Sequence, residues 1–175
     1  MWQPARDQVS TKETVGRRVF ESSPFFERNG KVLVKFSIFL ETRRNEEGLS
    51  FDRLGIRERD LQAIVAFLTP MALTEGVNRR PSRPFTGWIG IRVKKIRDLV
   101  VRPDPIEVEP KNPYHALLPL DQFREKVHAD NLAFRLASEA EDALIAPAAG
   151  YSPARDASSE LFRRWRNWLS RLISG

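Results

Sequence analysis

The dipeptide Asn29-Gly30 lies between two apolar runs in FFERNGKVLVKFSIFLE, and it constrains the fold more than any other feature. A two-residue hairpin turn of type I′ needs positive φ at both central positions, which asparagine and glycine adopt at little cost. After the turn, the residues of segment 31–40 alternate between apolar and polar, which predicts a strand with one buried face. The side chains expected on that face are Val32, Val34, Phe36, Ile38 and Leu40.

Periodic patterns predict the remaining elements. Segments 15–20, 86–94 and 114–118 are expected to form strands, and the polar segment 42–55 is expected to form a loop. A helix is expected over 57–69, with Leu61, Ile64, Val65 and Leu68 on its apolar stripe and Pro70 at its end or at a kink. A longer helix is expected from the N-cap residue Asp121 to Pro147. Its expected stripe is Phe123, Val127, Leu132, Ala133, Leu136, Ala137, Ala140 and Leu144.

These elements predict an α+β fold, with a mostly antiparallel sheet of three to six strands packed with two helices, plus a C-terminal amphipathic helix. A chain of 175 residues suffices for one domain and an appendage. The expected division is a core domain over 1–146, a linker over 147–157 and the C-terminal helix over 158–175.

Composition narrows the function classes. The chain has no cysteine, which excludes disulfides, thiolate chemistry and zinc or iron–sulfur sites built on cysteine. It has no P-loop, GxGxxG or GxSxG motif, so no cofactor is expected. The N-terminus has no apolar signal segment, and no run approaches the roughly 20 apolar residues of a membrane span. A cytoplasmic protein is therefore expected.

Positive charge is concentrated in one segment. The net charge is +6, yet the segment 79–102 holds eight cations and only one anion, Asp98. Such a concentration indicates a polyanionic partner, RNA or DNA. The residues expected to bind it are Arg79, Arg80, Arg83, Trp88, Arg92, Lys94, Lys95 and Arg97.

The alternation in TGWIGIRVKK assigns these side chains to faces of a strand. Ile89, Ile91 and Val93 are expected to point inward, which places Trp88, Gly90, Arg92 and Lys94 on the other face. An exposed tryptophan beside cations would let a base stack while the cations bind phosphates. The alternative is that Trp88 is covered and that the cations only keep a sheet edge soluble.

The two histidines, His115 and His128, are the main candidates for acid–base chemistry. Neither has a metal-ligand partner at a helical spacing, so no metal site is expected. A phosphodiester-processing enzyme would use His115 as general base and the arginines of segment 79–83 to stabilise phosphate. A lone histidine beside a solvated loop is the simpler interpretation, and it favours a protein that is not an enzyme.

The chain ends in SSELFRRWRNWLSRLISG, which has the apolar spacing of an amphipathic helix. Its stripe is Leu161, Phe162, Trp165, Trp168, Leu169, Leu172 and Ile173. We expect this stripe to dock on the protein's own domain, on a protein partner or on a second copy, more than on a membrane surface. The leading hypothesis is thus a nucleic-acid-binding protein, with an adaptor acting through this helix as the alternative and an enzyme third.

Overall fold

The structure is a computed structural model, and it describes residues 2–20, 23–40, 48–79, 84–100, 106–109, 112–119, 126–141 and 143–149. Within these ranges, three α-helices and a six-stranded antiparallel sheet confirm the predicted α+β fold. The strands of this sheet are β1 (Thr14–Val19), β4 (Gly48–Gly55), β5 (Gly87–Arg92), β6 (Glu107–Glu109), β7 (Asn112–Pro119) and β8 (Leu144–Ile145). Their order in the sheet is β6-β7-β4-β1-β5-β8.

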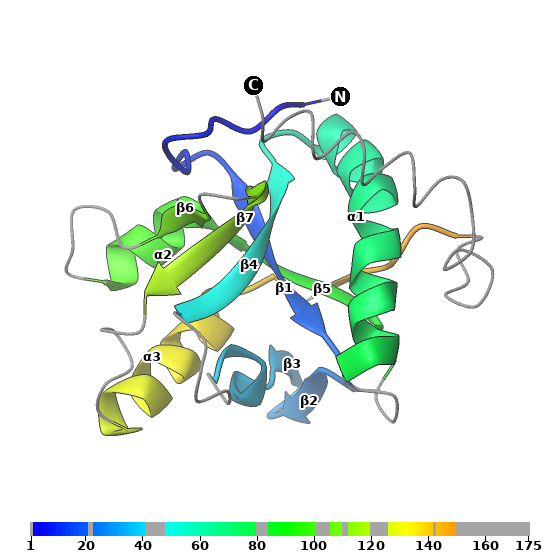
Figure 1. Ribbon diagram of the computed structural model, residues 1–175. Helices are drawn as coiled ribbons and strands as arrows, with labels where there is room; N and C mark the ends of the chain where they lie inside the picture. The colour runs from blue at the N-terminus through cyan, green and yellow to red at the C-terminus, as the bar shows by residue number, and fades with distance from the viewer. Residues whose placement is uncertain are drawn as a thin grey trace.

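The sheet is the middle of three layers (Figure 1). Helix α1 (Glu58–Arg79) covers one face. The other face is covered by α2 (Val93–Leu99), α3 (Lys126–Glu139), the 3₁₀ helix η1 (Phe36–Phe39) and a small hairpin of β2 (Phe25–Arg28) and β3 (Lys31–Val34). Within the described ranges, no helix is both long and apolar enough to cross a membrane.

Strand β4 was expected to be part of a polar loop, and that prediction is wrong for residues 48–55. The strand pairs with β1 on one side and β7 on the other, and nearly all of it is buried. Adjacent Asp52 and Arg53 make the segment polar in sequence, but each side chain is neutralised by partners from distant segments. Residues 41–47, which include the rest of the expected loop, lie outside the described residues.

Helix α1 extends through Pro70, where we expected its end or a kink. Ile64 and Leu68 on one side of the proline and Ala72 on the other are all fully buried against the sheet. The hydroxyl of Thr69 donates to the carbonyl of Val65 at 2.6 Å, within the turn that the proline interrupts. Tertiary packing therefore outweighs the backbone hydrogen bond that the proline removes.

Helix α3 confirms the second predicted helix, and Leu132, Ala133, Leu136 and Ala137 of its expected stripe are buried. Leu144 is not on this helix, because residues 144–145 pair with β5 as strand β8. Asp121 and Phe123 lie outside the described residues.

The expected linker begins against the core. The backbone N–H of Ala148 donates to the Thr69 hydroxyl at 3.0 Å, so the chain still follows α1 at this point. Residues 150–175, and with them the rest of the linker and the predicted C-terminal helix, lie outside the described residues.

The Asn29-Gly30 turn is confirmed, with φ of 53° at Asn29 and 70° at Gly30. The strand after it ends at Val34 and does not reach residue 40, because η1 follows. Consecutive residues Ile38 and Phe39 are both buried, which a 3₁₀ turn allows and a strand with one buried face does not. The hairpin forms its own two-stranded sheet and does not join the larger one.

The different burial of Val34 and Phe36 predicts which of two alanine substitutions costs more stability. Val34→Ala should lower the free energy of unfolding by about 2 kcal/mol, because Val34 is buried in the core. Phe36→Ala should cost well under that amount, because its side chain remains 44% exposed although we expected it to be buried. Urea unfolding of the two variants checks the ranking, and an equal or reversed loss would contradict it.

Candidate nucleic-acid interface

The cations that follow β5 lie on a helix rather than on a strand. Strand β5 ends at Arg92 and α2 begins at Val93, so the period-two alternation does not extend to Lys94. Val93 starts the helix because its N–H donates to the carbonyl of Glu13 at 3.0 Å, and Lys94 N–H donates to Thr11 at 3.2 Å. The N-terminal segment thus ends the strand by accepting hydrogen bonds from these two amide groups.

Four exposed cations gather at this corner of the molecule. Arg92, Lys94 and Lys95 are exposed, and the guanidinium of Arg92 donates to the carbonyl of exposed Lys12 at 3.1 Å. We call Lys12, Arg92, Lys94 and Lys95 the α2 patch. Three of its residues come from the predicted basic segment, and Lys12 was not predicted because it is distant in sequence.

Two anions lie within the α2 patch. Lys94 forms an ion pair with Asp98 one helical turn away at 2.7 Å, and Lys95 forms one with Glu139 of α3 at 3.2 Å. Both lysine side chains remain largely solvent-exposed, at 71% and 48%. Exposed pairs of this kind contribute only about 0–1 kcal/mol, so neither carboxylate holds its lysine firmly in place.

The other predicted cations that the structure describes do not belong to this patch. Arg97 is partly buried, and its guanidinium donates to the carbonyl of Val9 at 2.8 Å, which ties the N-terminal segment to α2. Arg79 is the last residue of α1, on the opposite face of the sheet from α2 (Figure 1). Arg80 and Arg83 lie outside the described residues.

Trp88 is not an exposed stacking platform, and the alternative, that its side chain is covered, is confirmed. Its side chain is fully buried under α1, in edge-to-face contact with Phe85 at a centroid distance of 4.7 Å. Gly16 of neighbouring β1 makes room for it, since a Cβ there would lie 3.0 Å from the Trp88 Cβ. The predicted inward set of Ile89, Ile91 and Val93 is confirmed, but both faces of β5 are covered.

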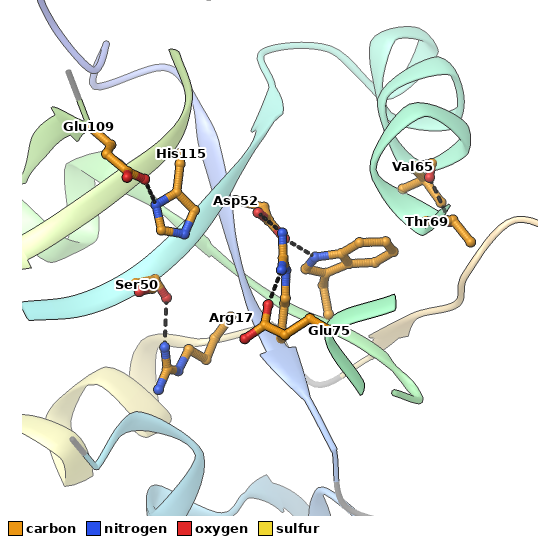
Figure 2. A network of polar contacts seen from close by, with 10 residues as sticks. Arg17, Ser50, Asp52, Val65, Thr69, Glu75, Glu109 and His115 are labelled. Atoms are coloured by element: carbon orange, nitrogen blue, oxygen red, sulfur yellow. Dashed lines mark hydrogen bonds and ion pairs between the residues drawn. The ribbon is translucent and has the colours of Figure 1, made fainter. Parts of the chain in front are cut away.

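A buried polar network around Asp52 was not predicted from the sequence (Figure 2). The indole N–H of Trp88 donates to Asp52 at 2.6 Å. The guanidinium of Arg18 donates to both oxygens of the same carboxylate, at 2.6 and 2.8 Å, and also to Glu75 of α1. Because Asp52 is only 1% exposed, the pair is shielded from water and from salt.

This pairing fixes the ionisation of the network. Burial opposes the charged form of Asp52, but the charge of Arg18 and its hydrogen bonds prevail, so the pKa of Asp52 lies below its ordinary value of 3.8. Burial likewise opposes the charge on Arg18, but attraction to Asp52 and Glu75 raises its pKa above the ordinary value. Both groups are therefore charged at neutral pH.

His115 lies in line with this network. Its Nδ1 is 2.6 Å from the Oε2 of Glu109 on β6, and in the β4–β7 register it is the partner of Asp52. From β6 to α1, acidic and basic groups thus alternate. They are the carboxylate of Glu109, the imidazole of His115, the carboxylate of Asp52, the guanidinium of Arg18 and the carboxylate of Glu75. The carboxylates beside His115 repel phosphate, so this arrangement does not favour a phosphodiester site.

His128, the other histidine, lies on α3, where only its backbone is described. Among the residues that the structure describes, no group of three or more His, Cys, Asp or Glu could hold a metal ion.

One signal in the sequence could have located the buried network. In GLSFDRL, Leu49 and Phe51 alternate with Ser50 and Asp52, which is the pattern of a strand whose second face is polar.

Comparison of the chain with models of protein families, with curated proteins and with solved structures returned no match.

Proposed function

We propose that the protein binds nucleic acid in the cytoplasm, and that the α2 patch contacts the phosphate backbone. The observation that carries the proposal is the gathering of four exposed cations from the N-terminal segment, β5 and α2 at one corner. A cluster of this kind binds phosphates without reading base sequence.

The proposed contact is electrostatic and weak. The anions Asp98 and Glu139 lie beside the α2 patch. The net charge of the patch is therefore smaller than the net charge of segment 79–102. Binding that rests on a few phosphate contacts has dissociation constants on the order of 10⁻⁴–10⁻⁶ M at physiological salt. Affinity should therefore fall steeply with salt and vary little with base sequence.

The test compares two double variants of equal charge. Lys94→Ala with Lys95→Ala should weaken the binding of a fluorescent oligonucleotide. It should also reduce the slope of log affinity against log salt by up to about two, because each lysine that no longer binds a phosphate removes about one unit. The control is Arg57→Ala with Arg59→Ala, which removes two exposed cations at the start of α1 on the opposite face. Fluorescence anisotropy over a salt series measures both.

Two results would contradict this proposal. The first is that the unmodified protein binds no oligonucleotide even at low salt. The second is that both double variants show the same drop in affinity, because the protein would then respond to net charge and not to the α2 patch.

A further inference from the structure

The Asn29-Gly30 hairpin exposes an aromatic ring and two cations on one face. In the register of β2 and β3, Phe25 pairs with Val34, Phe26 with Leu33 and Arg28 with Lys31. Val34 is buried and Phe25 packs on the core, so this pair marks the inner face. Because side chains alternate, the outer face holds Phe26, Leu33, Arg28 and Lys31, which we call the hairpin face.

The hairpin face is accessible and lacks anions. Phe26 is 40% exposed, and Arg28 and Lys31 are both exposed at the turn. Glu27, the acidic residue of the two strands, is on the inner face by the same alternation. Within the described part of the chain, neither cation has an ion-pair or hydrogen-bond partner. On α2, by contrast, both lysines are paired with carboxylates.

The two cations occupy directly opposite positions across the strands. Like charges in such a cross-strand pair destabilise a hairpin. Among the described residues no anion on this face relieves the repulsion, so the arrangement weakens the folded hairpin. A bound polyanion would relieve it, which makes the pair more useful for binding than for stability.

The order of residues along the hairpin favours a nucleic-acid strand over a membrane as the ligand. Arg28, Asn29, Gly30 and Lys31 form the tip, and Phe26 lies behind the cations on the same face, farther from the turn. Inserting Phe26 into a membrane would therefore first bury the charged tip, which is costly. A single nucleic-acid strand fits this order, because a base can stack on the ring while neighbouring phosphates reach the cations.

We propose that the hairpin face binds single-stranded nucleic acid, with Phe26 stacking on a base and with Arg28 and Lys31 binding phosphates. This inference rests on the proposed function and adds the class of ligand, because the bases of a duplex are already stacked and cannot reach the ring. The hairpin face and the α2 patch lie in the same layer of the fold, with α3 packed against both η1 and α2 (Figure 1).

The experiment measures the anisotropy of a fluorescent oligothymidylate and of a duplex of the same length. Phe26→Ala should weaken binding of the single strand about tenfold, with little effect on the duplex. Phe26→Trp should preserve single-strand binding, and Phe26→Leu should behave like Phe26→Ala because it has no π-face. Phe36→Ala is the matched control, since Phe36 has the same side chain and a similar exposure of 44% but lies outside the hairpin face.

A second variant separates binding from folding. Lys31→Glu sets an opposite charge across from Arg28, so it should raise the melting temperature while it lowers affinity for the oligothymidylate. A variant that merely disrupted the hairpin would lower both. An unchanged affinity in Lys31→Glu would overturn the role of this cation and with it the proposed site.

The outcomes distinguish this inference from the proposed function. If neither nucleic acid binds the unmodified protein, both fail. If binding is abolished in the α2 double variant but Phe26→Ala equals Phe36→Ala, only the hairpin inference fails. Full affinity in Phe26→Leu would overturn stacking, because the side chain would then provide only apolar contact. If Phe26→Ala abolished binding to phosphatidylserine vesicles and left oligothymidylate binding intact, the face would belong to a membrane surface and the inference would fail.

Discussion

Replacing Arg53 with lysine is expected to lower the free energy of unfolding by about 3 kcal/mol or more although the charge is retained, because each buried acceptor left without a donor costs about 1–3 kcal/mol. Arg53 is fully buried, and its guanidinium makes two hydrogen bonds to Glu13, at 2.7 and 2.8 Å. Its remaining donors reach the carbonyls of Ala5 at 2.6 Å, Pro113 at 2.9 Å and Gln8 at 3.0 Å. Lysine has three donors on one atom and cannot serve acceptors that lie in several directions.

The destabilisation should appear first in the N-terminal segment. Arg53 joins residues 5–13 to β4 and to the start of β7, and its guanidinium lies 5.7 Å from the ring centre of Trp2. Urea unfolding measures the change in stability, and limited proteolysis near the N-terminus detects release of the segment. Arg59→Lys on the exposed start of α1 is the control and should be silent. Equal stability of the two variants would contradict the assigned role of Arg53.

Several elements were predictable because their signals are local. The turn at Asn29-Gly30, the strand through Ile89 and Ile91, and the apolar stripe of α3 each depend on residues a few positions apart. Such patterns determine backbone conformation and which residues share a face. They predicted the fold class for the same reason, since a tight hairpin and alternating strands favour an antiparallel sheet.

The elements that were missed depend on distant partners. Strand β4 resembles a loop in sequence because Asp52 and Arg53 are charged, and their partners Arg18 and Glu13 come from segments more than thirty residues earlier. Helix α2 begins where the N-terminal segment accepts hydrogen bonds from the amides of Val93 and Lys94. Neither pairing leaves a periodic pattern in the segment that it shapes, so local reasoning could not find them.

Local sequence patterns also could not predict which strand face of the candidate binding site is exposed. Alternation assigned Trp88 to the face opposite Ile89, and that assignment is right, but it could not reveal that α1 covers the face. The combination of an aromatic ring and two cations on one strand face, which was predicted for segment 86–94, is instead present on the hairpin. There the short strands form a sheet of their own, and the outer face remains exposed. Coverage by other elements, and not residue type, decides which face can bind a ligand.

Removing the charge of Asp52 is expected to cost about 3–5 kcal/mol, because the largely buried guanidinium of Arg18 would lose its principal partner. The substitution Asp52→Asn keeps the shape of the side chain and an oxygen that can accept from the Trp88 N–H. Among the described residues, Glu75 would then be the charged partner left to Arg18, and Glu75 is itself 21% exposed. Asp98→Asn is the matched control, because it breaks an exposed ion pair with Lys94 and should cost at most about 1 kcal/mol. Thermal and urea unfolding measure both variants.

The pH dependence of stability separates the effect of charge from the effect of packing. Because the Asp52 pKa is lower in the folded protein than its ordinary value of 3.8, ionised Asp52 stabilises the fold at pH above 3.8. This contribution disappears as pH falls below 3.8 through the folded-state pKa, where protons bind more readily to the unfolded chain. The difference in stability between the unmodified protein and Asp52→Asn should therefore be constant near neutral pH and shrink below pH 3.8. A difference that stays constant throughout acid would show that Asp52 contributes packing and hydrogen bonds but no favourable charge.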